Sequence, residues 1–176
     1  MILAGPAQSE TAWFACLGQP LLSAQLGTAR AYFCALGYAA DAPIHAVDSW
    51  AAAERVVRDP QWERRWWEAE EQERERLLQR AGDRLGAGLL LERLSAATKL
   101  AADAIHAAAA IAAERDGSAD AALIRAASGA GAMALHELAL ARLAGCESEH
   151  LFMRKYRVFA SGRWPLGVLG GAFYLF

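Results

Sequence analysis

The sequence predicts a single all-α domain over residues 1–176, a helical bundle around a central antiparallel hairpin of two alanine-rich helices. The first observation behind this prediction is a pair of long segments, 87–115 and 119–144, in which alanine recurs at helical spacing. The second is that glycine, proline and capping residues divide the rest of the chain into further helices. The third is composition. Hydrophobic residues make up 55% and charged residues 22% of the chain, as in a globular domain that folds without disulfides or metal.

The N-terminal part is expected to form short helices joined by loops. Gly18 and Pro20 end a first predicted helix over 10–18, and a second one runs over about 21–37. The segment 37–48 that follows is predicted to be a loop.

Two capping signals mark the next helices. Ser49 is positioned to cap a helix over 50–58, because its hydroxyl can accept from the backbone N–H groups of the first turn. Asp59 followed by Pro60 predicts the N-cap and the first residue of another helix, where the missing N–H of proline costs nothing. That helix is expected to loosen towards Gly86.

The segment 61–84 is strongly charged, with seven acidic and six basic residues nearly interleaved. Side chains at helical spacing are predicted to form ion pairs on a solvated face. These pairs are Glu70 with Arg74, Glu71 with Arg74, and Glu73 with Arg76. Trp62, Trp66 and Trp67 do not fit a solvated face. Because tryptophan is enriched in interface hot spots, we expect these rings either to lie in a protein–protein interface or to cover one end of the core.

The predicted central hairpin spans residues 87–145. Gly117 suits the position just after the first helix, and Ser118 suits the N-cap of the second. A connection this short turns the second helix back along the first. Two rows of alanine are predicted to face each other, which brings the axes towards the lower end of the usual range of roughly 8 to 10 Å. The rows are Ala97, Ala101, Ala104 and Ala108, and Ala122, Ala126, Ala130 and Ala134.

The C-terminal part is predicted to be a short helix over 149–162 followed by a small β-hairpin that turns at the glycine pair 170–171. Pro165 would confine the first strand to a sheet edge, because proline has no backbone N–H to donate. A lone hairpin is marginally stable in water, so it should dock against the helices or against a partner. We therefore include Phe173 and Tyr174 in the predicted interface.

The net charge of −2 argues against a protein that binds nucleic acid through bulk positive charge. One basic cluster is too small to change this expectation: Arg154, Lys155, Arg157 and Arg163. The three cysteines are widely spaced and predict no disulfide framework, which favours the cytoplasm. They are Cys16, Cys34 and Cys146. The first 13 residues lack the pattern of a signal peptide, and charges interrupt every alanine-rich stretch, so we expect no membrane span.

His136 and Glu137 lie side by side in an apolar segment and raise the question of a metal site. The zinc motif H-E-x-x-H is incomplete, because Leu140 stands at its fifth position. A di-iron bundle uses E-x-x-H pairs on two helices. The chain approximates that spacing twice, with Asp103 and His106 and with Glu147 and His150. The order of the helices fits this template poorly, so we predict no cofactor and interpret the His-Glu pair as structural.

These observations favour a protein that acts by association, as a homodimer or as a subunit bound to another protein. The predicted interface is Trp62, Trp66, Trp67, Phe173 and Tyr174. One alternative is a metal-dependent helical-bundle enzyme that uses Asp103, His106, His136, Glu137, Glu147 and His150. Another is a helical protein that binds a small apolar ligand in a pocket lined by aromatic residues. No residue is assigned a catalytic role.

Overall fold

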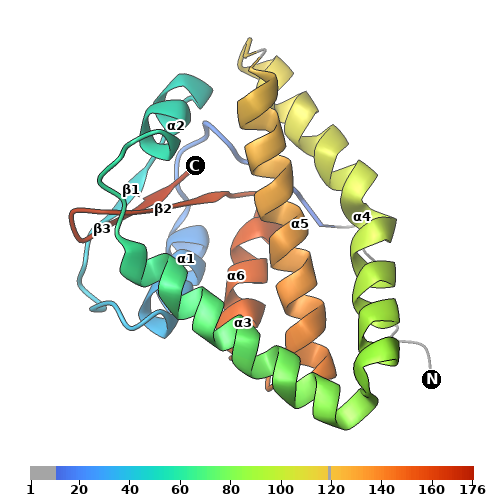
Figure 1. Ribbon diagram of the computed structural model, residues 1–176. Coiled ribbons are helices and arrows are strands. Elements are labelled where there is room, and N and C mark those ends of the chain that lie inside the picture. Colours follow the sequence, from blue (N-terminus) through green and yellow to red (C-terminus); the bar gives the residue numbers. More distant parts are fainter. Residues whose placement is uncertain (1–10, 119) are drawn as a thin grey trace.

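A computed structural model describes residues 11–118 and 120–176 (Figure 1). These residues are mostly helical and carry a small sheet in addition. The helices are α1 (Ser23–Ala35), α2 (Trp50–Val57), α3 (Arg64–Leu85), α4 (Ala87–Arg115), α5 (Ala121–Leu143) and α6 (Leu151–Ala160). The strands are β1 (Ile44–Ala46), β2 (Pro165–Leu169) and β3 (Ala172–Leu175). The predicted absence of a signal peptide, and the first residues of the helices predicted over 10–18 and 119–144, fall outside the described residues.

Helices α4 and α5 lie side by side and are joined by a short turn (Figure 1). Gly117 adopts φ 68° at this turn, and its N–H donates to the carbonyl of Glu114 at 3.0 Å, which closes α4 as its sequence predicted. The prediction that Ser118 caps α5 is wrong. Asp120 is the cap instead, because its Oδ1 accepts from the backbone N–H of Ala122 at 2.7 Å and of Leu123 at 3.0 Å.

The predicted alanine rows contribute only in part to the contact between α4 and α5. Ala101 and Ala134 are buried, whereas Ala104 and Ala122 are exposed. The buried side of α4 is instead Leu94, Ala101, Ile105, Ala109 and Ala112, and that of α5 is Leu123, Ala127, Gly131, Ala134, Leu138 and Ala141. Several rows in an alanine-rich helix satisfy the same spacing, so the spacing alone does not select the buried one.

The small sheet has the strand order β1-β3-β2. Strands β2 and β3 form the predicted antiparallel hairpin, and it turns at Gly170 (φ 56°) and Gly171 (φ 77°). Pro165 lies on β2 at the sheet edge, as expected. Strand β1, however, lies in the predicted loop and pairs parallel with β3, with His45 opposite Tyr174. Three residues are too few to show an alternating pattern, so this strand depends on β3 for its conformation.

One predicted helix, over 10–18, and one predicted helix start, at Pro60, are wrong because tertiary contacts override the local signals. Residues 13–18 form turns rather than a helix, with Trp13 and Phe14 buried. Helix α3 begins at Arg64 rather than at Pro60. Trp62, which lies between Pro60 and Arg64, makes an isolated β-bridge with Leu169 of β2, and this pairing keeps the backbone extended. The Ser49 cap of α2 is confirmed, since its Oγ accepts from the N–H of Ala52 at 3.3 Å.

The main apolar core lies between α4, α5, α6 and α2, and a second cluster lies between α1 and the sheet. Helix α3 runs diagonally across the lower part of the view in Figure 1 and contacts α4 and α5. Within the described residues, no helix is both long and apolar enough to cross a lipid bilayer.

Candidate functional site

The two tryptophans nearest the start of α3 are largely accounted for within the chain. The rings of Trp62 and Trp66 stack with their centroids 5.6 Å apart, and both side chains are half-buried. The Trp62 Nε1–H donates to the carbonyl of Val56 at 3.0 Å. The Trp66 Nε1–H donates to the hydroxyl of Tyr32 at 2.9 Å. Both polar groups are thus satisfied internally, and the rings cover one side of the sheet and α1.

The C-terminal aromatic residues also pack within the chain. Phe173 is fully buried, and its ring stacks on that of Phe33 with centroids 5.0 Å apart. Tyr174 is half-buried, with its ring 5.2 Å from that of His45. Of the five aromatic residues predicted for an interface, Trp67 has the most exposed side chain, with 59% of its surface accessible to solvent. The apolar tail therefore finds its surface on α1 and β1, which the sequence left open as one of two outcomes.

The six residues considered for a metal site are spread over the molecule. Asp103, His106 and Glu147 are exposed. The His106 Nδ1 lies 3.1 Å from Ser128 Oγ on the neighbouring helix α5. Among residues 11–118 and 120–176, no three His, Cys, Asp or Glu side chains gather in a group that could hold a metal ion. The geometry therefore gives no support to the metalloenzyme alternative.

His150 has a structural role at the start of α6. Its Nδ1 accepts from the backbone N–H of Phe152 at 3.2 Å and so caps the helix. Its Nε2 lies 2.7 Å from Glu73 Oε1 on α3. His136 is half-buried on α5, and burial lowers its pKa against the opposing influence of the neighbouring Glu137. Among the described residues, neither His136 nor His150 belongs to a group of side chains that could hold a metal ion.

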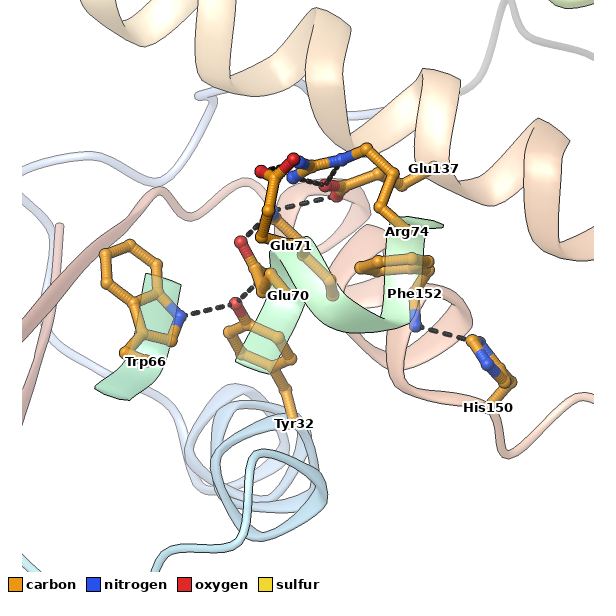
Figure 2. Close-up of polar contacts among 9 residues, drawn as sticks. Tyr32, Trp66, Glu70, Glu71, Arg74, Glu137, His150 and Phe152 are labelled. Carbon is orange, nitrogen blue, oxygen red and sulfur yellow. Dashed lines mark hydrogen bonds and ion pairs between the residues drawn. The ribbon is translucent and has the colours of Figure 1, made fainter. Parts of the chain in front are cut away.

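A buried ionic network joins α3, α5 and α6 (Figure 2). Glu137 is fully buried, and its Oε1 accepts from Arg74 Nη2 at 2.7 Å and from Arg74 Nε at 3.3 Å. The Lys155 Nζ lies 2.8 Å from Glu137 Oε2 and donates to Glu70 Oε2, also at 2.8 Å. Arg74 in addition pairs with Glu71, at the exposed end of the network.

The network continues from Glu70 into α1. The Tyr32 hydroxyl donates to Glu70 Oε1 at 2.5 Å and accepts from Trp66, so the chain of contacts runs through four helices (Figure 2). This arrangement corrects one predicted ion pair, because Glu70 pairs with Lys155 on α6 and not with Arg74. The predicted pairs of Glu71 with Arg74 and of Glu73 with Arg76 are confirmed.

The protonation states of the network suit a structural role. Burial alone would lower the pKa of Lys155, but Glu70 and Glu137 outweigh it, so the pKa is raised and the ammonium keeps its charge. Burial raises the pKa of Tyr32 well above its ordinary value, and the charge of Glu70 raises it further. Neither group loses its proton at neutral pH, so neither is available as a base or a nucleophile.

The signal for this network was present in the sequence. Glu70 follows Trp66 by four residues and precedes Leu77 by seven, so it lies on the apolar face of its helix. Its partner Lys155 lies 85 residues further on, and nothing local links the two. The basic C-terminal cluster is dispersed in the same way. Lys155 enters the network, while Arg163 is buried and donates to Gln25 and to the carbonyl of Pro20.

The opposite situation holds on α4, where large apolar side chains face away from the core. Leu100 is 79% exposed, Ile111 58% and Leu89 39%. The three are spaced by eleven residues, which is within about 20° of three full turns, so they form one line along the helix. Ala96 and Ala107 fall on the same line and are exposed, and the exposed Arg93, seven residues before Leu100, interrupts the line with a charged group. We call the five apolar residues of this line the outer face of α4.

The outer face lies on the side of α4 away from its buried residues Leu94, Ala101 and Ile105. In Figure 1, α4 forms one edge of the molecule, with α5 on its inner side. Leu91 is also exposed, at 68%, but it projects about 180° away from Leu100 around the helix.

Comparison of the chain with protein-family models, with curated proteins and with solved structures finds no match.

Proposed function

We propose that the protein acts by association with a polypeptide that covers the outer face of α4. The observation that carries this proposal is the line formed by Leu89, Leu100 and Ile111, all exposed on a helix whose other side packs into the core. A helix that is apolar on both sides is normally covered on both sides.

The energy available on this face is large enough to matter. Fully burying a leucine or isoleucine side chain contributes roughly 1.5 to 3 kcal/mol. The outer face offers three such side chains in one line, with Ala96, Ala107 and the charged Arg93 between them. A group of exposed apolar side chains rimmed by charged ones, here Arg93, Lys99 and Asp103, is typical of a protein contact.

The proposal moves the contact away from the aromatic residues that the sequence favoured. Trp62, Trp66 and Phe173 have internal partners, so they support the fold and not the association. Trp67 remains accessible on α3 and is a secondary contact at most. We propose the cytoplasm as the site of this association, because the three cysteines of the chain are free thiols and need no oxidising compartment.

The test is a photo-reactive amino acid placed at position 100 of the full chain, expressed in the cells that naturally contain it. We expect irradiation to yield a species heavier than the 18.9 kDa chain. The matched control places the same group at Leu91, which is nearly as exposed on the same helix but points the other way. Equal yields at the two positions, or no cross-link at position 100, would refute the proposal.

A further inference from the structure

We infer that a groove between α1 and α6 binds a small carboxylic acid, with its carboxylate on Arg154 and Arg157 and its apolar body along α1. These two arginines belong to the basic cluster of the C-terminal sequence, whose other members, Lys155 and Arg163, are buried. The site is separate from the outer face of α4 and does not depend on the proposed association.

The groove lies where α1 and α6 pack side by side (Figure 1) and has a volume of about 320 Å³. This volume is at the lower end of the roughly 300 to 1,000 Å³ of small-molecule sites. A Cβ added at Gly27 would meet nothing within 4 Å, so the space above this residue is open. The groove is lined by Arg154 and Arg157 of α6 and by four small residues of α1: Ala24, Gly27, Thr28 and Ala31.

Backbone carbonyl groups fix both guanidiniums beside the groove. Arg154 donates from Nη1 to the carbonyl of Ala31 at 3.1 Å and from Nε to the carbonyl of Glu149 at 2.7 Å. Arg157 donates from Nη2 to the carbonyl of Ser148 at 2.9 Å. The Glu149 carboxylate joins the two, because its Oε2 lies 3.1 Å from Arg154 Nη2 and its Oε1 lies 3.1 Å from Arg157 Nη1. Both guanidiniums are therefore oriented before a ligand arrives, which lowers the entropic cost of binding.

These contacts leave donor groups and positive charge at the groove. They occupy three N–H groups of Arg154 and two of Arg157, about half of those that two guanidiniums carry. Neither α1 nor α6 contains Asp or Glu in its sequence. Among the ion pairs of residues 11–118 and 120–176, Glu149 is the one carboxylate on these arginines. Two positive charges thus face one negative charge, so a carboxylate balances them, whereas a phosphate dianion leaves an excess of negative charge.

The α1 side of the groove favours an apolar body for the ligand. The Thr28 hydroxyl donates to the carbonyl of Ala24 at 2.9 Å, so its proton is not available to a ligand. The other three α1 residues of the groove are alanine and glycine and carry no polar side-chain group. A hydrocarbon chain lies on such a surface without leaving a polar group unpaired, while a polar body would lose its hydrogen bonds to water.

Isothermal titration calorimetry of the purified full chain with octanoate tests the inference. We expect one saturable site with a dissociation constant of about 1 mM or lower. Octanol has the same chain without the charge, and inorganic phosphate has charge without the chain. Each should bind at least about tenfold more weakly than octanoate. Absence of octanoate binding, equal binding of octanol, or tighter binding of phosphate would each overturn the inference.

Two variants locate the site. Gly27→Leu fills the open space of the groove and should abolish octanoate binding while it keeps α1, because leucine favours helix over glycine. Arg157→Gln removes one guanidinium and should raise the dissociation constant by about tenfold. The matched controls are Gly129→Leu, which also faces open space but on α5, and Arg80→Gln, which is exposed on α3. Both controls should bind octanoate like the wild-type chain.

A third variant tests the balance of charge. Glu149→Gln keeps the size of the side chain and one acceptor but removes the negative charge, so it should tighten octanoate binding by about threefold or more. Circular dichroism checks that every variant keeps its helices. Weaker binding by Glu149→Gln would contradict the charge argument. Unchanged binding by both Gly27→Leu and Arg157→Gln would place octanoate elsewhere, and either result would overturn the inference.

Discussion

Helices α3 and α4 follow one another in the chain, yet each contradicts what its composition suggests. In α3, 12 of the 22 residues are charged, but Glu70 is buried at the centre of an ionic network. In α4, 6 of the 29 residues are charged, but leucine and isoleucine side chains face solvent. Charge density therefore does not decide which side chains are covered. The neighbours of each helix do.

The difference follows from position. Helix α3 is contacted by side chains of α1, α5 and α6, so a carboxylate on its inner side meets Tyr32 and Lys155 instead of water. Helix α4 packs against α5 and the end of α3, which cover one side of it. A buried charge is tolerated in α3 because it is paired, and an exposed leucine on α4 has no covering neighbour among residues 11–118 and 120–176. We expect the two helices to respond differently to substitution.

The largest expected effect is in the ionic network that α3 shares with α5 and α6, at Glu137 on α5. Glu137→Ala removes the carboxylate shared by Arg74 and Lys155 and leaves two cations nearly buried without it. Breaking a buried ion pair in this way costs roughly 3 to 5 kcal/mol of the free energy of unfolding. Denaturant unfolding followed by circular dichroism measures it.

Glu147→Ala is the matched control, because Glu147 is exposed. It should change the free energy of unfolding by about 0.5 kcal/mol or less. If the two variants lose the same small amount, water reaches the network in solution, and the contrast between α3 and α4 would be much weaker than the structure indicates.

A smaller effect tests the inner side of α4. A Cβ added at Gly131 on α5 would lie 2.9 Å from Ile105 Cγ2, whereas one at Gly129 would meet nothing within 4 Å. Alanine favours helix over glycine by about 1 kcal/mol, so Gly129→Ala should stabilise the protein by up to that amount. Gly131→Ala should instead destabilise it by about 1 kcal/mol, because overpacking of roughly 1 to 3 kcal/mol outweighs the same gain.

The readout for the glycine pair is the difference between their denaturation midpoints. Opposite signs would confirm that α5 presses closely on one side of α4, which leaves the outer face as the free one. If both variants are stabilised, Ile105 moves aside easily and the packing between α4 and α5 is looser than the distances indicate.

Local signals predicted those elements whose ends are defined within a few residues. The bounds of α4, its closure at Gly117, the Ser49 cap and the hairpin with Pro165 on its edge all depend on contacts of short range. The turns at 13–18 and strand β1 were missed because their conformations depend on segments over 100 residues away.

The candidate sites were harder to predict for the same reason. The interpretation of Glu137 as structural did not identify Arg74, which lies 63 residues earlier. The sequence favours an interface for Phe173 and Tyr174 because it shows that the C-terminal segment is apolar, but it does not show that Phe33 packs against this segment. Conversely, the sequence does not distinguish Leu100, since a leucine in an alanine-rich helix has the composition of a core residue. Only the fold shows that this position has no neighbour in the described chain.

The smallest expected effect is a pH dependence that α3 owes to Glu73. Burial would raise the pKa of this carboxyl, but hydrogen bonds from Arg76 (2.6 and 2.8 Å) and from His150 (2.7 Å) outweigh it and lower the pKa below 4.5. A carboxyl whose pKa is lower in the folded state stabilises the protein above its unfolded pKa, and this contribution is lost as the pH falls from 4.5 through the folded value. The free energy of unfolding, measured in urea between pH 6 and pH 3, should therefore fall more steeply for the wild-type chain than for Glu73→Gln. The two curves should converge at the acidic end, because a protonated Glu73 resembles glutamine.

Other carboxyls, such as Glu149, add to the total slope in both chains, so the difference between the curves isolates Glu73. Arg76→Gln removes one of the partners and should reduce the difference in part. A constant gap between the curves across this range would show that Glu73 gains nothing from its partners on folding, and that the charged surface of α3 contributes to stability no more than that of α4.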